Sequence, residues 1–228
     1  MNKYKVSRNQ EGNTVHVEGK NERKFFQWNN SRSLSVHFTV RVPKQFNLDL
    51  QTSGGDLIVS NITGRADGNT SGGNLDISDF TGPVKLETSG GDIRIVHADG
   101  DLYLRTSGGN IRGEKVIGTF DIETSGGDIR CRDIDAKLRA TTSGGNIEVT
   151  LLSNKGANLG TSGGNVRIYL PKDVTADVDA ESTGGDVSCE MDFNGKIKDG
   201  RMNGRINGGG SLISAHTSGG DITVSAVN

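Results

Sequence analysis

The chain has 228 residues and a net charge of −2, which argues against a basic nucleic-acid-binding protein. Its apolar runs all fall short of the roughly 20 residues of a transmembrane helix, and no apolar signal-peptide core follows Met1. The sequence therefore predicts no nucleic-acid partner and no transmembrane segment. It leaves open a cytoplasmic protein or an exported one whose leader has been removed.

Residues 1–50 are predicted to form a cap of strands within the same domain as the rest of the chain. Apolar and polar residues alternate over residues 14–17 and 34–42, which predicts two strands, and Pro43 ends the second. Residues 24–28 hold the only Trp and are expected to pack over the first repeat. The alternative for this Trp is an exposed platform on which a sugar ring stacks.

Residues 51–228 are built on a recurring phrase, Thr-Ser-Gly-Gly followed by Asp or Asn. The phrase begins at Thr52, Thr70, Thr88, Thr106, Thr124, Thr142 and Thr161, has its first two residues exchanged at Ser182, and returns at Thr217. The first five steps are 18 residues each, and the later steps are 19, 21 and 35 residues. A fixed period near 20 indicates a repeat protein whose units pack on their neighbours, here with irregular C-terminal coils.

Each repeat carries two predicted strands. Apolar residues lie one and three positions after the residue that closes a phrase, as Leu75 and Ile77 do, with mostly polar residues between them. A second apolar pair follows, as Val84 and Leu86, and a corner glycine such as Gly82 separates the strands. The pattern predicts an all-β fold, a parallel β-solenoid of the right-handed β-helix type with about nine coils of roughly 18 residues.

The start of the repeats carries a family resemblance. Val-Arg-Val-Pro at 40–43 leads into Leu-Asp-Leu-Gln-Thr-Ser-Gly-Gly-Asp-Leu-Ile-Val at 48–59, and serial Thr-Ser-Gly-Gly-Asp-Ile copies follow. From about residue 34 onwards the chain resembles a bacterial family of β-strand-repeat domains of unknown function that carries the label adhesin. The resemblance implies a β-helix-like fold and a cell-envelope or extracellular location, and it brings no catalytic residues with it.

One column of the repeat is always an acid or an amide. Its members are Asp56, Asn74, Asp92, Asn110, Asp128, Asn146, Asn165 and Asp186, with Asp221 after the long gap. We interpret the column as a structural ladder in which no two aspartates fall in directly successive coils, because stacked carboxylates repel each other. A row of calcium sites is the alternative. The threonines that open the phrases are expected to point inward and bond to the backbone; a water-facing, ice-binding threonine ladder is the alternative.

Arg94, Arg112 and Arg130 share one outward column in three successive coils. They predict a solvent-exposed face on which Asp92 and Asp128 partly neutralise the charge of the arginines. The functional alternative is a basic stripe that binds an anionic polysaccharide, to which the forked guanidinium group is suited.

The two cysteines, Cys131 and Cys189, fall in one column and are expected three coils, roughly 14 Å, apart. A disulfide needs Cα atoms within about 7 Å, so two free, buried thiols are predicted.

The sequence contains no catalytic motif. The four histidines lack metal-ligand spacing, and no nucleophile, phosphate-loop or dinucleotide motif is present, so no catalytic residues, metal site or cofactor are predicted. We expect a non-catalytic structural or adhesion-type module of the bacterial cell envelope. The alternatives are a binder of anionic polysaccharide along the arginine column and a β-helix glycan-cleaving enzyme. Envelope polysaccharide or another surface protein is the expected partner, and end-to-end self-association is a further possibility.

Overall fold

The computed structural model describes residues 4–21 and 36–227, and the chain divides between Arg41 and Val42 into two compact units. In the first unit, β1 (Tyr4–Glu11) and β2 (Thr14–Asn21) form an antiparallel hairpin. The strand predicted over residues 14–17 is thus part of β2.

The strand predicted over residues 34–42 is wrong for the part that the structure describes, residues 36–42, where no strand forms. Alternation shows that a segment has one apolar face, but it does not show that the segment joins a sheet. Within the solenoid unit, the Thr63 N–H donates to the Lys44 carbonyl, just after this segment. Residues 24–28 lie outside the described residues, and the inclusion of residues 1–50 in the solenoid domain stays a prediction.

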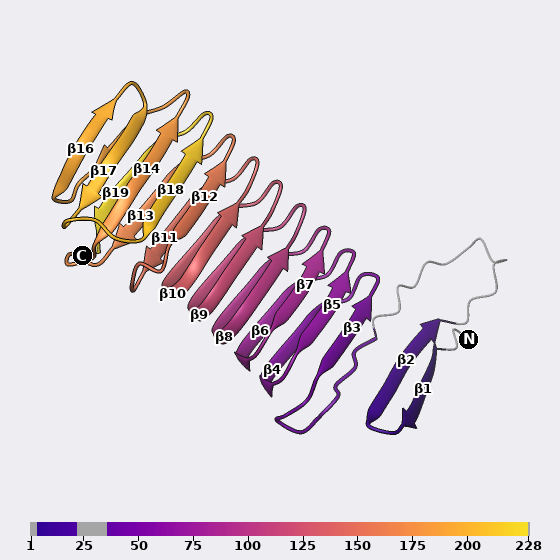
Figure 1. Cartoon of the computed structure of the whole chain (residues 1–228). Helices are drawn as coiled ribbons and strands as arrows, with labels where there is room; N and C mark the ends of the chain where they lie inside the picture. The colour runs from indigo at the N-terminus through magenta and orange to yellow at the C-terminus, as the bar shows by residue number, and fades with distance from the viewer. Residues whose placement is uncertain (1–3, 22–35, 228) are drawn as a thin grey trace, which may run out of the picture. The chain divides into compact units, whose positions relative to one another are not determined.

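The second unit is a parallel β-solenoid made of strands and turns, as predicted (Figure 1). We call face 1 the strands that lead into the phrases and face 2 the strands that follow them. The separate strands of face 1 are β3 (Leu48–Thr52), β5 (Ala66–Thr70), β7 (Val84–Thr88) and β12 (Ala157–Thr161). Those of face 2 are β4 (Leu57–Thr63), β6 (Leu75–Thr81), β11 (Ile147–Leu151) and β13 (Val166–Leu170). Three long strands run from face 2 of one coil into face 1 of the next: β8 (Ile93–Arg105), β9 (Ile111–Glu123) and β10 (Ile129–Thr141).

Seven coils follow one another in chain order with parallel pairing on both faces. Their face 1 strands stack at one register position through Leu48, Ala66, Val84, Leu102, Phe120, Leu138 and Ala157. The predicted number, about nine coils, differs from this regular run because the last two phrases do not continue it in sequence order.

The C-terminal coil is inserted between two coils that precede it in the chain. It consists of β18 (Leu212–Thr217) and β19 (Ile222–Ala226), and the coil beyond it consists of β14 (Ala176–Ser182) and β15 (Val187–Cys189). β18 pairs in parallel with β12 and β14, and β19 pairs in parallel with β13 and β15. Figure 1 shows the yellow β18 between β12 and β14.

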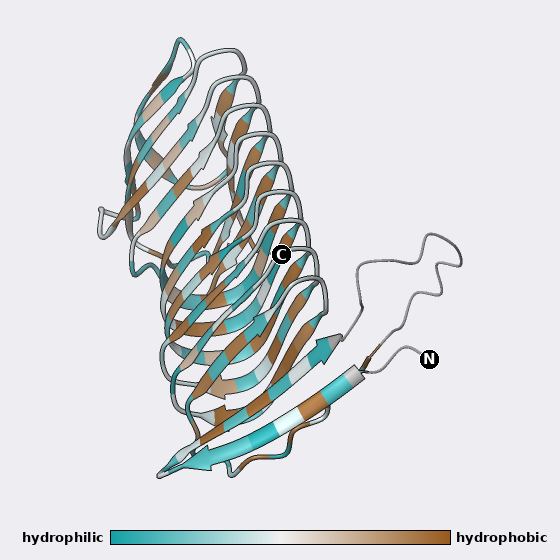
Figure 2. Ribbon diagram, turned by 90° about the vertical axis from the view of Figure 1, so that its right-hand side faces the viewer, coloured by the Kyte–Doolittle hydropathy of each residue, from teal (hydrophilic) through white to brown (hydrophobic). Residues whose placement is uncertain are grey.

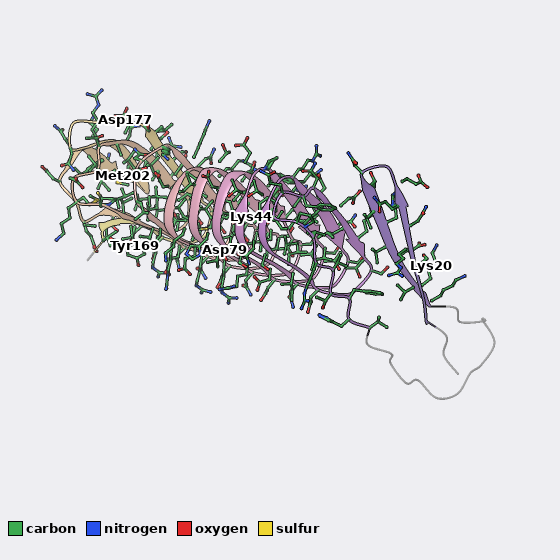
Figure 3. All side chains as sticks on the ribbon, turned by 90° about the horizontal axis from the view of Figure 1, so that it is seen from below. Lys20, Lys44, Asp79, Tyr169, Asp177 and Met202 are labelled. Carbon is green, nitrogen blue, oxygen red and sulfur yellow. The ribbon has the colours of Figure 1, made fainter. Side chains whose placement is uncertain are left out.

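The 35 residues between the last two phrases also form a hairpin. β16 (Phe193–Lys198) and β17 (Arg201–Ile206) are antiparallel, and β17 adds to β14 in the antiparallel sense. Met202 of β17 is fully buried, whereas Asp177 of β14 ion-pairs with Arg205 at the surface (Figure 3). Face 1 thus continues past β14 with two more strands, β17 and β16, whereas face 2 ends at β15 of the same coil.

The core runs along the inside of the coils. Hydrophobic and hydrophilic residues alternate along the strands (Figure 2). From the second coil onward the inward columns are buried, as the two apolar pairs per repeat predict, with few exceptions, Gly68 and Cys189 among them. The column of Ile93, Ile111 and Ile129 is an example, with exposures of 1% or less. The threonines that open the phrases, from Thr70 to Thr217, are also buried.

In each of the first five coils, the strand that follows the phrase bends at a residue with left-handed backbone. These residues are Asn61, Asp79, His97, Lys115 and Asp133, with φ between 52° and 58°. The corner glycines that follow, such as Gly82 (φ 124°), also have positive φ, as predicted. Asn, Asp and His tolerate the left-handed conformation better than other residues, so Lys115 is the exception in this column.

Among the described residues, no helix has the length and hydropathy needed to cross a membrane.

Candidate functional site

The threonine that opens each phrase locks one coil to the next. Thr106 is typical: its Oγ1 donates to the carbonyl of Gly91 in the preceding coil at 2.9 Å and accepts from the N–H of Gly109 at 3.3 Å. The same pair of bonds recurs at Thr70, Thr88, Thr124, Thr142, Thr161, Ser182 and Thr217. These hydroxyls are buried and bonded to backbone, as predicted, so they form no water-facing threonine ladder.

From the second phrase onward, the second glycine of each phrase is required by close packing between coils. A Cβ at Gly109 would lie 2.0 Å from the carbonyl oxygen of Gly91, whereas one at the preceding Gly108 would lie 3.7 Å from its nearest neighbour, the Ser89 carbonyl. The sequence predicts a glycine corner here, but on the ground that glycine has a freer backbone. Glycine is needed at position 109 because of the contact with the preceding coil. At Gly82 the preceding coil is also close, but there the backbone has positive φ as well.

The acid and amide column forms a continuous ladder of hydrogen bonds. The Oδ1 of Asp92 accepts from the backbone N–H of Asn110 at 2.7 Å, and the Oδ1 of Asn110 accepts from the N–H of Asp128 at 2.9 Å. The other steps join Asp56 to Asn74, Asn74 to Asp92, Asp128 to Asn146, Asn146 to Asn165, Asn165 to Asp221 and Asp221 to Asp186. Each side-chain oxygen therefore satisfies a corner N–H of the next coil.

The side-chain amides of the asparagines have a smaller role in the ladder than their oxygens: the Nδ2 of Asn110, which lies between Asp92 and Asp128, donates only to Asp92, at 3.2 Å. The Nδ2 of Asn146 donates only to the carboxylate of Asp128, at 3.2 Å. The N–H of Asn146 is the first cause that holds the pKa of Asp128 below its usual range, and Arg130 adds to it.

The expectation that no two aspartates occupy directly successive coils is wrong at the C-terminal end. The N–H of Asp186 donates to the Oδ1 of Asp221 at 2.9 Å, because the inserted coil places Asp221 between Asn165 and Asp186. The order of the last coils in space could not be seen in the spacing of the phrases.

The structure brings Arg94, Arg112 and Arg130 side by side as paired positions on face 2. Each is about half exposed and has an acidic partner: Arg94 and Asp76 at 3.3 Å, Arg112 and Asp92 at 3.8 Å, Arg130 and Asp128 at 2.9 Å. The stripe is thus a row of charge pairs. Exposed pairs of this kind are worth about 0–1 kcal/mol, so the guanidinium groups can exchange partners at little cost.

Face 1 carries a second charged surface. Arg105 pairs with Glu123 at 2.6 Å, and Arg139 pairs with Asp121 at 3.1 Å, each across one coil spacing. Lys85 lies 5.9 Å from the ring centroid of Tyr103. Beside this surface is a shallow polar depression of about 280 Å³, lined by Asn69, Thr70, Ser71, Glu87, Thr88, Ser89, Arg105 and Ser107. The charge columns were visible in the sequence, but the depression was not, because it depends on how far each side chain extends.

The two cysteines are free. Cys131 is fully buried, and this burial raises the pKa of its thiol to about 12. Cys189 is only half-buried, which differs from the prediction, and burial also raises its pKa. The inserted coil puts four strand spacings between them, or about 19 Å, rather than three.

Within the described ranges, no group of three or more His, Cys, Asp or Glu side chains is arranged to hold a metal ion. A search of curated proteins and a search of solved structures each find no match to the chain. The family model described as Toastrack DUF4097, a domain of unknown function, matches residues 1–225. With its serial phrases wound into a β-solenoid, the chain belongs to the Toastrack DUF4097 family.

Proposed function

We propose that this protein is a non-catalytic structural module of adhesion type in the bacterial cell envelope, a stiff rod that holds attached partners at a fixed spacing. The observation that carries the proposal is the pair of internal ladders. Every coil from the second onward is tied to its neighbour by a phrase-opening hydroxyl and by an acid or amide oxygen, in addition to backbone pairing on both faces.

Such bonding supports a mechanical role because no coil can tilt or slide without breaking several buried hydrogen bonds. Each bond contributes about 0.5–1.5 kcal/mol, and an unsatisfied buried partner costs about 1–3 kcal/mol. Among the described side chains, no buried nitrogen or oxygen lacks a hydrogen-bond partner. The family resemblance supports the envelope location.

A second candidate function is binding of an anionic polysaccharide along face 2. It is favoured by the direct stacking of Arg94, Arg112 and Arg130, whose guanidinium groups recur at about one strand spacing, ~4.8 Å. A polymer with regularly spaced carboxylates or phosphates would replace Asp76, Asp92 and Asp128 as partners of the arginines.

The test is co-sedimentation of the purified protein with envelope polysaccharide and with peptidoglycan, at low and at high salt. The rod proposal expects no salt-sensitive binding and no release of sugar fragments. Salt-sensitive binding that is lost when Arg94, Arg112 and Arg130 are all replaced by Gln would favour the polysaccharide binder. Release of sugar fragments would favour a glycan-cleaving enzyme and overturn both proposals.

A matched control variant is available on the other face. Replacing Arg65, Arg105 and Arg139 by Gln removes the same charge from face 1 and the corner that leads into it, where each arginine is paired with an acid. Loss of binding in both triple variants would indicate attraction to net charge rather than to the arginine column of face 2.

A further inference from the structure

The C-terminal coil, residues 212–226, lies in a slot whose two walls are formed by other coils. One wall of the slot is β12 and β13, and the other is β14 and β15. Both walls precede the coil in the chain, so within the described residues the coil is joined to the rest of the solenoid through residues 207–211.

The slot fits only a segment whose apolar residues alternate along two strands. The inward side chains Ile213, Ala215, Thr217, Ile222 and Val224 are at most 3% exposed. An unfilled slot would expose the apolar faces of two coils and leave backbone donors and acceptors of both walls unpaired. Only a strand pair with the same alternation, joined by a phrase, would restore these contacts.

The phrase of the C-terminal coil bonds to both walls. Thr217 Oγ1 donates to the carbonyl of Gly164 at 2.8 Å on one side, and Ser182 Oγ donates to the carbonyl of Gly220 at 2.6 Å on the other. The ladder continues across the slot through Asn165, Asp221 and Asp186. A second copy of this chain carries the one segment that is certain to match both walls.

The link to the coil has the features of a hinge. Gly208 and Gly209 have φ of 91° and 94°, and a Cβ at Gly208 would meet nothing within 4 Å. Asn207 is held because its Nδ2 donates to the carbonyls of Lys172 and Val174, and the carbonyl of Ser211 accepts from the Nδ2 of Asn154. The pivot therefore lies between them, at residues 208–210. Residues 208–211, when extended, span roughly 13–14 Å.

Chain order creates a competition for the slot. The coil of β14 and β15 carries its own phrase, residues 182–186, and it is synthesised before the C-terminal coil. If it stacks directly on β12 and β13 first, the C-terminal coil has to enter between the two coils afterwards. During this rearrangement the C-terminal coil of each molecule is unpaired and the slot is opening.

We propose that the slot accepts the C-terminal coil of a second copy of the chain, which yields a strand-exchanged dimer. Each slot of the dimer holds the same residues as in the monomer, so the two forms differ only in the hinge and in the entropy of association. The tethered coil has an effective concentration in the mM range, which favours the monomer once it has formed. Refolding at high protein concentration favours the exchanged dimer.

Two single-cysteine chains test the exchange. Asn158 and Ser214 are directly paired positions of β12 and β18 with outward side chains. One chain carries Asn158→Cys and the other Ser214→Cys, and both carry Cys189→Ser to remove the half-buried thiol. The two chains are unfolded together, refolded at low and at high concentration, and oxidised in air. The proposal expects a disulfide-linked heterodimer whose yield rises several-fold with protein concentration.

The matched control pairs Arg139→Cys with Asn158→Cys in separate chains. These positions are also directly paired, but in coils that are consecutive in the chain. A heterodimer yield no higher than in this control, at both concentrations, would overturn the proposal. Light scattering of the unmodified protein after refolding at high concentration gives a second readout: dimer that reverts to monomer after unfolding and refolding when dilute supports exchange, and monomer alone contradicts it.

Discussion

The ring of Phe120 occupies the space that a side chain at Gly113 would need: a Cβ there would lie 2.6 Å from Cε1 of Phe120. Gly113 stands in an inward column between Ile95 and Cys131, where other coils have larger apolar residues. The fully buried ring replaces the missing side chain from the opposite face of the solenoid. The core is thus filled jointly by residues that belong to different coils.

Gly113→Ala is expected to lower the free energy of unfolding by about 1–3 kcal/mol, because the buried Phe120 ring has no room to move. Phe120→Leu alone leaves a cavity and also destabilises the protein. The double variant is expected to be more stable than the sum of the two losses predicts, since the smaller side chain makes room for the methyl group. Urea unfolding of the four proteins measures this coupling, and strict additivity would show that the two positions do not interact.

The two glycines of one phrase are expected to respond very differently to the same change. Gly109→Ala forces a methyl group against the Gly91 carbonyl, so we expect a loss of more than about 3 kcal/mol or failure to fold. Gly108→Ala meets only ordinary contacts and is expected to change stability by roughly 0.5 kcal/mol or less. Thermal unfolding followed by circular dichroism compares the pair; equal midpoints would contradict the close packing of the coils.

Removing one phrase-opening hydroxyl is expected to strand two buried backbone groups. Thr106→Val keeps the shape of the side chain but leaves the Gly91 carbonyl and the Gly109 N–H without their partner. We expect a loss of about 2–4 kcal/mol in the free energy of unfolding. Thr106→Ser retains the hydroxyl and loses one methyl group, which costs about 1 kcal/mol. Ser182 already makes both bonds in its own coil, so a Ser variant as unstable as the Val variant would count against the ladder.

Lys115 is the one member of the left-handed column whose side chain does not favour that backbone. Lys115→Asn is expected to stabilise the protein by about 0.5–1 kcal/mol, because Asn adopts positive φ at lower cost. Lys137→Asn is the control, since Lys137 is an exposed strand residue without positive φ. Urea midpoints measured for both variants decide the point; a stabilisation that appears equally in the control would be an effect of charge.

The Cys131 thiol is expected to make the stability of the protein depend on alkaline pH. Its pKa is about 12 in the folded state against 9.0 for an ordinary thiol, so between these values the unfolded chain ionises while the folded protein keeps its proton. The contribution of the buried, protonated thiol to the free energy of unfolding is fully present below pH 9. It is lost as pH rises, by about 1.4 kcal/mol per pH unit between pH 9 and 12.

The measurement is the free energy of unfolding of the wild type and of Cys131→Ala at pH 8, ~10 and ~11. The variant is less stable at pH 8 because of its cavity, but the gap between the two proteins is expected to narrow as pH rises. A gap that stays constant would show that the thiol does not titrate differently in the two states.

The repeating part of the fold was readable from the sequence because its period is local. The alternation around Leu75 and Ile77 determines the buried face, and buried threonines such as Thr106 follow from the same parity. The requirement for Gly109 was predicted for a different physical reason, since backbone freedom and close approach both select glycine. Sequence alone does not separate these two causes.

The order of the C-terminal coils was not readable from the sequence, because two different strand pairs can add to β12 and β13. The phrases at Ser182 and Thr217 are equally able to continue the stack, and the spacing gives no order between them. The order is decided by three-dimensional pairing, including the hairpin that places β17 on β14. The adjacency of Asp221 and Asp186, the half-buried state of Cys189 and the interrupted run of coils all follow from that one insertion.

The ladders also bear on how the length of this molecule can change during evolution. Each regular coil presents to the next coil the same kind of acceptor oxygens that its own N–H and hydroxyl donors find on the coil before, as the Asp92, Asn110 and Asp128 steps show. Duplication or loss of an 18-residue stretch of the gene product therefore preserves the threonine bonds and the ladder bonds at the new junction. Rod length becomes adjustable in steps of one strand spacing, about 4.8 Å, while both ends keep their own chemistry.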